Sequence, residues 1–322
     1  MIRAAIVGLG RWGQNLVGSV QGSSSKIRFT HGMVRRLGGV AGYAQKTGLT
    51  LLSSYEEVLA QKDIDAVVLA TPHDLHVDQI TAAAAAGKAV FCEKPLAMTR
   101  DEAERAIRAV EAAKVTLGVG HDKRFWPSMQ ELKRQVESGV LGTLLHIEGN
   151  LSNENSRATY REWRGKPENS PGGSLTATGI HILDAFVHLM GPASRITASY
   201  TSRPGAEVQD SMAMLFEFES GATGLLASVR PTPVFWRVHA FGSTGSAEAR
   251  GTDDLELRLS GQKPRLIPGQ PLNALAFELE AFADAVAGVA PYPISHEQML
   301  RTAVTLEAAA RAVDTKTTVT LD

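Results

Sequence analysis

The stretch IRAAIVGLGRWG, residues 2–13, decides how the chain begins to fold. Residues 2–7 have β-strand character and run directly into three glycines spaced as G-x-G-x-x-G, after which a helix-type segment begins. Gly8 suits the tight turn, Gly10 lets the backbone approach a pyrophosphate, and Gly13 allows the helix to pack closely on the strand. The free N–H groups at the helix N-terminus favour phosphate. The stretch predicts a dinucleotide site; the alternative is merely a tight strand-to-helix turn.

The same alternation of strand-type and helix-type segments continues to about residue 120. Two helix starts are indicated by capping-box spacings, Ser54 with Glu57 and Thr99 with Glu102. Alternation of this kind predicts crossover units and a parallel sheet covered by helices, the doubly wound α/β architecture. The further strand-type runs of this part are residues 27–34, 65–70, 88–92 and 115–120.

The alternation of strand-type and helix-type segments ends after residue 122. This change predicts a dinucleotide-binding domain at 1–122 and a second α/β domain at 123–322. A helix at about 127–138 and a strand at 143–150 are followed by an irregular segment rich in Pro and Gly. A helix ending at Gly191 comes next, and then several β-type runs separated by Gly and Pro turns, as in antiparallel sheets. Two further helices, at about 272–288 and 296–313, close the chain.

Composition favours a small-molecule role for the protein. The 322 residues are about twice a typical domain length. The net charge of −1 gives no reason to expect nucleic acid or an acidic membrane surface as a partner. Cys92 is the only cysteine, which excludes an intrachain disulfide and fits a reducing compartment. No apolar stretch approaches the length of a membrane span, so we expect a cytoplasmic protein that binds no membrane.

The end of the second strand predicts which coenzyme the glycine loop holds. An acid there would normally bind the ribose hydroxyls of NAD, but no Asp or Glu occurs before Glu56. Arg35 and Arg36 occupy this position instead, and a guanidinium suits a 2′-phosphate in charge and in donor geometry. The sequence therefore favours NADP over NAD; the alternative is a solvated basic loop.

Several motifs occur in an order that resembles one known family. They are the glycine loop, Ala70-Thr71-Pro72 with His76 beyond, Glu93-Lys94-Pro95, Gly120-His121 with Arg124-Phe125, and Gly179, His181 and Asp184 spaced as G-x-H-x-x-D. Together they are similar to the Gfo/Idh/MocA oxidoreductases, which are named for glucose-fructose oxidoreductase and inositol dehydrogenase. The resemblance covers essentially the whole chain.

The resemblance implies a Rossmann domain joined to an α/β domain whose open, mainly antiparallel sheet packs on a partner subunit. A homo-oligomer, a dimer or tetramer formed through that sheet, is expected on this ground. The active site of the family lies between the domains, where Lys94 and His181 are the implied catalytic residues. The residues agree, since Lys94 follows the carboxyl end of a parallel strand, where such sheets bind ligands.

This chain departs from the family at Ala177, where many members place an aspartate one helical turn before the histidine. Without that carboxylate, His181 keeps its suitability as an acid or base but loses a device for fixing its tautomer. A metal site made by His181, Asp184 and His188 is not expected. One helix can present two such ligands, whereas a zinc site needs three or four in the right geometry. The expectation is therefore no metal.

The remaining candidates complete the predicted site. Substrate contacts are expected from Lys94, Arg124, Trp163, Arg164, Thr178, His181 and Asp184. Equal alternatives are interdomain packing for Arg124, subunit contacts for Trp163 and Arg164, and helix anchoring for Asp184. The predicted coenzyme-binding residues are Gly8, Leu9, Gly10, Arg11, Trp12, Gly13, Arg35, Arg36, Thr71, Pro72, His76, Glu93 and Lys94.

These inferences predict an oxidoreductase that moves a hydride between the nicotinamide and a carbinol or carbonyl carbon of a small polar substrate. A sugar, a cyclitol or a related hydroxy compound is expected. The alternatives are a reductase of an imine or a cyclic diol, and a regulatory protein of the same fold that senses NADP without turnover. Ala177 keeps the second alternative open.

Overall fold

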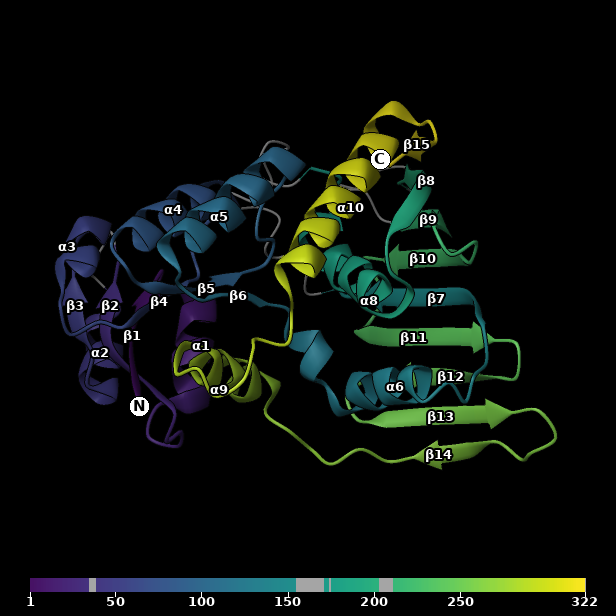
Figure 1. Ribbon diagram of the computed structural model, residues 1–322, viewed down its shortest axis with the longest axis horizontal. Helices are drawn as coiled ribbons and strands as arrows, with labels where there is room; N and C mark the ends of the chain where they lie inside the picture. Colours follow the sequence, from purple (N-terminus) through teal and green to yellow (C-terminus); the bar gives the residue numbers. More distant parts are fainter. Residues whose placement is uncertain (35–38, 155–170, 174, 203–210, 322) are drawn as a thin grey trace. The chain divides into compact units, whose positions relative to one another are not determined.

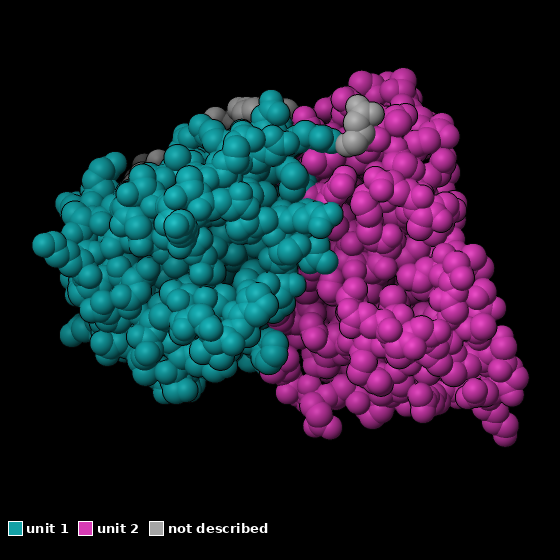
Figure 2. All heavy atoms as spheres, viewed as in Figure 1, with its two compact units in different colours: residues 1–122, 273–300 teal, residues 123–272, 301–322 magenta. Residues whose placement is uncertain are grey.

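The computed structural model describes residues 1–34, 39–154, 171–173, 175–202 and 211–321. The chain forms two compact units, shown in teal and magenta in Figure 2. Unit 1 contains Met1–Asp122 and Asn273–Leu300, and unit 2 contains Lys123–Leu272 and Arg301–Asp322.

Unit 1 is built on a six-stranded parallel sheet with the strand order β3-β2-β1-β4-β5-β6 (Figure 1). The order reverses next to β1, which is the arrangement of a doubly wound dinucleotide-binding domain and confirms the predicted class. The strands are β1 (Ile2–Val7), β2 (Ile27–Met33), β3 (Thr50–Leu52), β4 (Ala66–Leu69), β5 (Ala89–Glu93) and β6 (Leu117–Gly120).

Helices cover both faces of this sheet. Figure 1 shows α4 and α5 on one face and α1 and α9 on the other. The N-cap half of both predicted capping boxes is present, because the side chains of Ser54 and Thr99 accept the N–H groups of Glu57 and Glu102. The two glutamate carboxylates accept the N–H groups one residue before the N-cap, those of Ser53 and Met98. The helices are α1 (Arg11–Val20), α2 (Ala41–Thr47), α3 (Tyr55–Ala60), the short η1 (His73–Leu75), α4 (His76–Ala85), α5 (Arg100–Ala113) and α9 (Ala274–Val286).

Helix α9 lies in unit 1, although the sequence prediction assigned residues 273–300 to the second domain. Its side chains Leu279, Phe282 and Ala283 belong to the buried core formed with β1, β2, β5 and α1. The ring of Phe282 packs edge-on against Phe91 of β5. The chain returns to the first sheet because that face would otherwise expose apolar side chains to water.

Unit 2 contains a nine-stranded sheet with the order β14-β13-β12-β11-β7-β10-β9-β8-β15. Strands β7 and β10 run parallel, and the other described pairs are antiparallel. This is the mainly antiparallel sheet that the resemblance implied. The strands are β7 (Leu144–Ser152), β8 (Ala193–Thr201), β9 (Ser211–Phe218), β10 (Thr223–Val229), β11 (Phe235–Gly242), β12 (Gly245–Arg250), β13 (Asp254–Leu259), β14 (Arg265–Ile267) and β15 (Val319–Thr320).

The helices of unit 2 pack on one face of its sheet (Figure 1). They are η2 (Asp122–Phe125), which starts at the unit boundary, α6 (Pro127–Glu137), η5 (Leu175–Gly179), α8 (Ile180–Met190) and α10 (His296–Thr315), whose first residues belong to unit 1. Helix α8 lies close to the sheet at Gly149 of β7, where a Cβ atom would collide with Ile182 and come within 3.0 Å of Phe186. The glycine thus lets α8 approach the strands.

Among the residues with described positions, no helix is long and apolar enough to cross a bilayer.

Candidate functional site

The glycine loop has the geometry of a phosphate cradle. Gly8 has a φ of +97°, which favours glycine, and a Cβ there would lie 2.5 Å from the carbonyl oxygen of Ala70 after β4. A Cβ on Gly13 would collide with the Gly8 carbonyl oxygen, so this glycine allows α1 to pack against the turn. Gly10, in contrast, has nothing within 4 Å of an added Cβ. Two glycines are therefore needed for packing, and the third leaves open space at the N-terminus of α1.

A nicotinamide dinucleotide fits this arrangement. Gly10 is the N-cap residue of α1, and no side chain caps the helix there. Free N–H groups beside open space are what a pyrophosphate needs. The fit rests on the shape of the loop. When bound, a nicotinamide coenzyme supplies a ring carbon that accepts or donates a hydride.

Two predicted coenzyme contacts cannot be placed. Arg35 and Arg36 lie outside the described residues, which resume at Gly39. Strand β2 before them ends at Met33, and the N–H of Val34 donates to the carbonyl oxygen of Leu52. Trp163 and Arg164, predicted to contact substrate, are likewise outside the described residues.

The turn after β4 is held by His76, which is fully buried. One ring nitrogen lies 2.8 Å from the carbonyl oxygen of Pro95, and the other lies 3.1 Å from that of Thr71. Burial lowers the pKa of His76. The Thr71 hydroxyl donates to Gln79 at 2.6 Å. His76 thus connects the turns that follow β4 and β5, and this position suits a residue that orients loops.

Glu93 and Lys94 stand at the carboxyl end of β5. The Glu93 side chain is buried, and its Oε2 accepts the backbone N–H of Lys94 at 3.3 Å. Lys94 is half-buried, and the peptide bond that joins it to Pro95 is cis. The end of β5 therefore carries one buried carboxyl group and one partly accessible ammonium group.

The pKa of Glu93 is raised to about 7, mainly because burial disfavours the charged form. Interaction with the Trp12 side chain and the positive charge of Lys94 lower it, whereas Asp122 raises it. The carboxyl group therefore changes its charge near neutral pH. Sequence reasoning named Glu93 as a coenzyme contact but gave no reason to expect this titration.

In unit 2, His181 lies in the first turn of α8 and is buried. The residues before it, Leu175–Gly179, form one π-helical turn, a feature frequently found at functional sites. Thr178, predicted to contact substrate, lies in this turn and is also buried, whereas Ala177 is half-buried. The π turn was not predicted, since apolar and small residues in this stretch give no signal for it.

Arg124 and Asp184 are brought together by the fold. Nε and Nη2 of Arg124 donate to the two carboxylate oxygens of Asp184, each at 2.7 Å, and both side chains are buried. Arg124 Nη1 lies 3.0 Å from Nδ1 of His188, and the Thr302 hydroxyl of α10 donates to Asp184 at 3.4 Å. The pair joins η2, α8 and α10, so it anchors the helix that carries His181.

His188 is a neutral member of this network. Burial and the adjacent Arg124 charge lower its pKa to about 3. Lys133 of α6 also donates to the His188 carbonyl oxygen at 3.0 Å. Over the residues the structure describes, no cluster of three or more His, Cys, Asp or Glu side chains could hold a metal ion.

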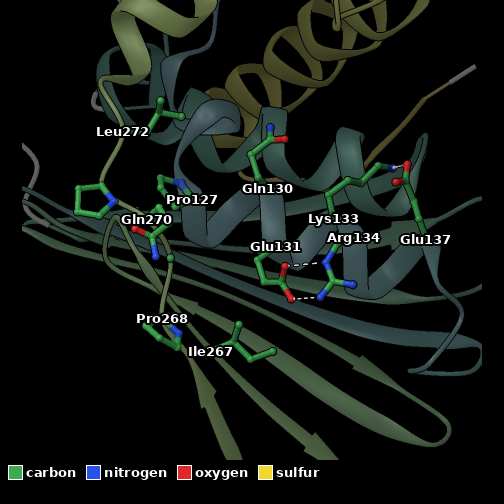
Figure 3. A pocket seen from close by; sticks show the side chains of 12 residues that line it. Pro127, Gln130, Glu131, Lys133, Arg134, Glu137, Ile267, Pro268, Gln270 and Leu272 are labelled. Carbon is green, nitrogen blue, oxygen red and sulfur yellow. Dashed lines mark hydrogen bonds and ion pairs between the residues drawn. The ribbon is translucent and has the colours of Figure 1, made fainter.

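A pocket of about 670 Å³ lies in unit 2 between α6 and the segment 267–272 (Figure 3). Its charged side chains form ion pairs, Arg134 with Glu131 and Lys133 with Glu137. None of the predicted site residues lines it. The candidate residues of unit 1 therefore lie in the glycine loop and at the ends of β4 and β5, and those of unit 2 lie at the start of α8.

Comparison with known families assigns both parts of the chain. Residues 2–121 match the oxidoreductase family with an NAD-binding Rossmann fold, and residues 129–248 match the GFO/IDH/MocA C-terminal domain. The chain belongs to the GFO/IDH/MocA family. Membership makes it an oxidoreductase-family protein with a Rossmann fold that binds a nicotinamide coenzyme, and it confirms the resemblance found in the motifs.

Proteins similar to this chain differ in the substrates and coenzymes that their names give. The rhizopine catabolism protein MocA of Rhizobium meliloti is 30% identical over 310 residues, which cover 90% of this chain and 88% of that protein. A D-xylose 1-dehydrogenase (NADP(+)) of Haloferax volcanii is 28% identical over 287 residues, 85% of each chain. A levoglucosan dehydrogenase solved with NADH and levoglucosan shares the fold, with a TM-score of 0.89, 20% identity and coverage of 100% of this chain and 99% of that one.

Proposed function

We propose that this protein is a cytoplasmic dehydrogenase that transfers a hydride between NADP and a carbinol carbon of a sugar, a cyclitol or a related polyhydroxy compound. The observation that carries the proposal is the end of β5. Lys94 follows this strand directly, and ligands of doubly wound sheets bind outside the carboxyl ends of the strands. The names of two similar proteins, a D-xylose 1-dehydrogenase and a levoglucosan dehydrogenase, support the substrate class.

The proposed roles follow from the chemistry of each side chain. Lys94 accepts the proton of the reacting hydroxyl group, because an ammonium group near the positive charge of an oxidised nicotinamide loses its own proton more easily. His181 orients the substrate and assists the proton transfer, and Thr178 contributes a hydroxyl group next to it. Arg124 and Asp184 act by holding α8 in place, since each is paired with the other.

The preference for NADP rests on sequence. No acid occurs before Glu56, and two arginines follow the second strand. A 2′-phosphate supplies the negative charge that a guanidinium binds best. Relatives that use NAD and NADP both occur, so this preference belongs to the proposal and is tested separately below.

Turnover with a panel of sugars, cyclitols and diols tests the proposal. We expect reduction of NADP⁺ with at least one polyhydroxy substrate. On that substrate, Lys94→Ala and His181→Ala should retain coenzyme binding and lose turnover about a hundredfold to ten-thousandfold, with Lys94→Ala the larger loss. Near wild-type kcat/KM in Lys94→Ala would contradict the assigned role. Coenzyme binding without turnover on any substrate would instead favour a coenzyme sensor.

The open face of the nine-stranded sheet is proposed to pack against a second copy of the chain. Leu215 and Leu225 are paired on neighbouring strands of this face and are 44% and 45% exposed. Beside them, alternating charges form ion pairs across four strands, through Glu148, Arg237, Glu248, Arg250, Glu256 and Arg258. Such a face is self-complementary when related by a two-fold axis. Sedimentation of the wild type against Leu215→Arg tests this, and a monomeric wild type would exclude it.

A further inference from the structure

The Glu93 side chain occupies a tight space at the ends of two neighbouring strands. Glu93 of β5 and Gly120 of β6 are register partners. A Cβ atom on Gly120 would lie 2.9 Å from Oε1 and 3.1 Å from Cδ of Glu93. Contacts this short require one group to move. The absence of a side chain at position 120 therefore makes room for this carboxyl group.

The polar surroundings of the carboxyl group are incomplete. Oε2 accepts the Lys94 N–H, whereas Oε1 is buried with no hydrogen-bond partner among the described residues. The groups that act on its charge are the Trp12 side chain in the glycine loop, Lys94 after β5 and Asp122 after β6, and the buried Cys92 thiol is also close. A buried carboxyl group with so few partners is readily shifted between its charged and neutral forms by a new charge nearby.

Glu93 lies in the half of the sheet that the nicotinamide would occupy. In a sheet of this order, the half formed by β1, β2 and β3 holds the adenosine, since the residue that binds its ribose follows β2. The other half, formed by β4, β5 and β6, then holds the nicotinamide. The oxidised nicotinamide ring carries a positive charge that the reduced ring lacks.

We propose that Glu93 is a proton-linked positioning group that distinguishes the two oxidation states of the coenzyme, releasing its proton when the oxidised form binds and keeping it when the reduced form binds. The inference rests on the proposed coenzyme function. In the binding step, the protein with protonated Glu93 binds the oxidised coenzyme. The products are a complex in which Glu93 is a carboxylate, and one free proton. The positive ring stabilises the carboxylate, and the neutral reduced ring gives no such stabilisation.

This linkage makes the affinity for oxidised coenzyme depend on pH. The pKa of Glu93 falls on binding, so affinity rises with pH between the pKa of the complex and that of the free protein, and it is constant outside this window. A fall of one pKa unit corresponds to about a tenfold gain in affinity. The affinity for reduced coenzyme should lack this component.

Isothermal titration calorimetry of NADP⁺ and NADPH measures the effect without any substrate. The number of protons released is obtained from the binding enthalpies in two buffers, phosphate and Tris, at the same pH. Both coenzymes carry the same phosphates, so the titration of those groups cancels in the comparison. We expect NADP⁺ to release more protons than NADPH, with the largest difference at or just below the pKa of about 7 for Glu93.

Two variants and a control assign the proton. Glu93→Gln should abolish the difference between the coenzymes at and below pH 7, whereas Glu56→Gln, the same change on an exposed side chain of α3, should retain it. Protons that Lys94 gives up beside the oxidised ring would be released above this range, because the ordinary pKa of lysine is about 10.4. Trp12→Phe removes an interaction that favours the carboxylate, so the pH of the largest difference should rise. This variant also decides the matter if Glu93→Gln does not fold.

Equal proton release by both coenzymes in the wild type would overturn the proposal. The proposal would also be overturned if Glu93→Gln left the difference in proton release unchanged. The same holds if the pH of the largest difference does not rise in Trp12→Phe. Failure of the proposed function looks different, because the protein would then bind neither coenzyme or would bind both without turnover. Binding with turnover and without the proton difference contradicts this inference alone.

Discussion

Arg124 and Asp184 form a buried, bidentate ion pair across 60 residues of sequence, with both N···O distances at 2.7 Å. The pair fixes α8 to η2, and the Thr302 hydroxyl adds a contact from α10. Because His181 lies one turn before Asp184 on the same helix, the pair determines where the imidazole is held. A charge pair this far from solvent is maintained only because each partner neutralises the other.

We predict that Asp184→Ala destabilises the protein by about 3–5 kcal/mol, since it leaves the Arg124 charge buried without its partner. Denaturation in urea measures the loss. Replacing both residues, in Arg124→Met with Asp184→Leu, should cost much less than the single change. The matched control is Asp78→Ala, which breaks the Arg105–Asp78 pair whose side chains are 53% and 74% exposed, and this should cost less than about 1 kcal/mol. Equal losses of stability in Asp184→Ala and Asp78→Ala would contradict the prediction that the buried ion pair matters more than the exposed one.

A second prediction concerns Glu93 and the stability of the protein as a function of pH. Its folded pKa of about 7 lies above the ordinary value of 4.5, so the folded state binds the proton more tightly than the unfolded state. The Glu93 contribution to stability is therefore fully present below about pH 4.5 and is lost as pH rises towards 7. The loss amounts to at most about 3 kcal/mol. Glu93→Gln should consequently gain stability relative to the wild type between pH 5 and pH 8, as measured by denaturation at both pH values. A constant difference between the two proteins would show that Glu93 does not titrate in this range.

Local signals in the sequence predicted the elements that carry the coenzyme loop. The glycine spacing, the two capping boxes and the strand-type runs correspond to β1, α1, α3 and α5, because these features depend on neighbours in the chain. The short strands β3 and β14 were not predicted, since three residues are too few for a pattern to be visible. Strands β12 and β13 were not predicted either, because the ion pairs between their charged side chains form only when the sheet brings the two strands together.

Contacts between distant residues set the limits of prediction at the site. The sequence marked Arg124 and Asp184 as candidate substrate contacts and placed His188 on the same helix as Asp184, but only the fold shows that the three side chains contact each other. The place of α9 in unit 1 also depends on its fit to a core formed by residues 180 or more positions earlier in the chain. Glu93 illustrates the same limit, because its pKa depends on Gly120 leaving room and on Trp12 and Asp122 lying near.

The coenzyme preference gives a third prediction. We expect tighter binding of NADPH than of NADH, because Arg35 and Arg36 stand where an acid would favour NADH. Arg35→Ala should narrow the gap, and added salt should weaken NADPH binding more than NADH binding. Fluorescence titration measures both affinities. Lys46→Ala, which removes a positive charge from the last turn of α2, serves as the control for net charge. Equal affinities of the wild type for NADPH and NADH would exclude the proposed role of the two arginines. A loss of NADPH affinity in Lys46→Ala as large as that in Arg35→Ala would exclude it too.

The last prediction separates the two kinds of glycine in the coenzyme loop. Gly10 has a φ of −75°, which alanine adopts readily, and an added Cβ has no neighbour within 4 Å. Gly10→Ala should therefore change the free energy of unfolding by no more than about 1 kcal/mol, since the helix only exchanges one uncapped N-cap residue for another. The methyl group enters the space where the pyrophosphate must approach, so coenzyme affinity should fall at least about tenfold.

At Gly13 the added Cβ meets the Gly8 carbonyl oxygen, and Gly13→Ala should cost about 1–3 kcal/mol of stability as well as affinity. Urea denaturation and NADPH titration of both variants distinguish the two effects. If Gly10→Ala bound NADPH as tightly as the wild type, the open space above Gly10 would not be the pyrophosphate site.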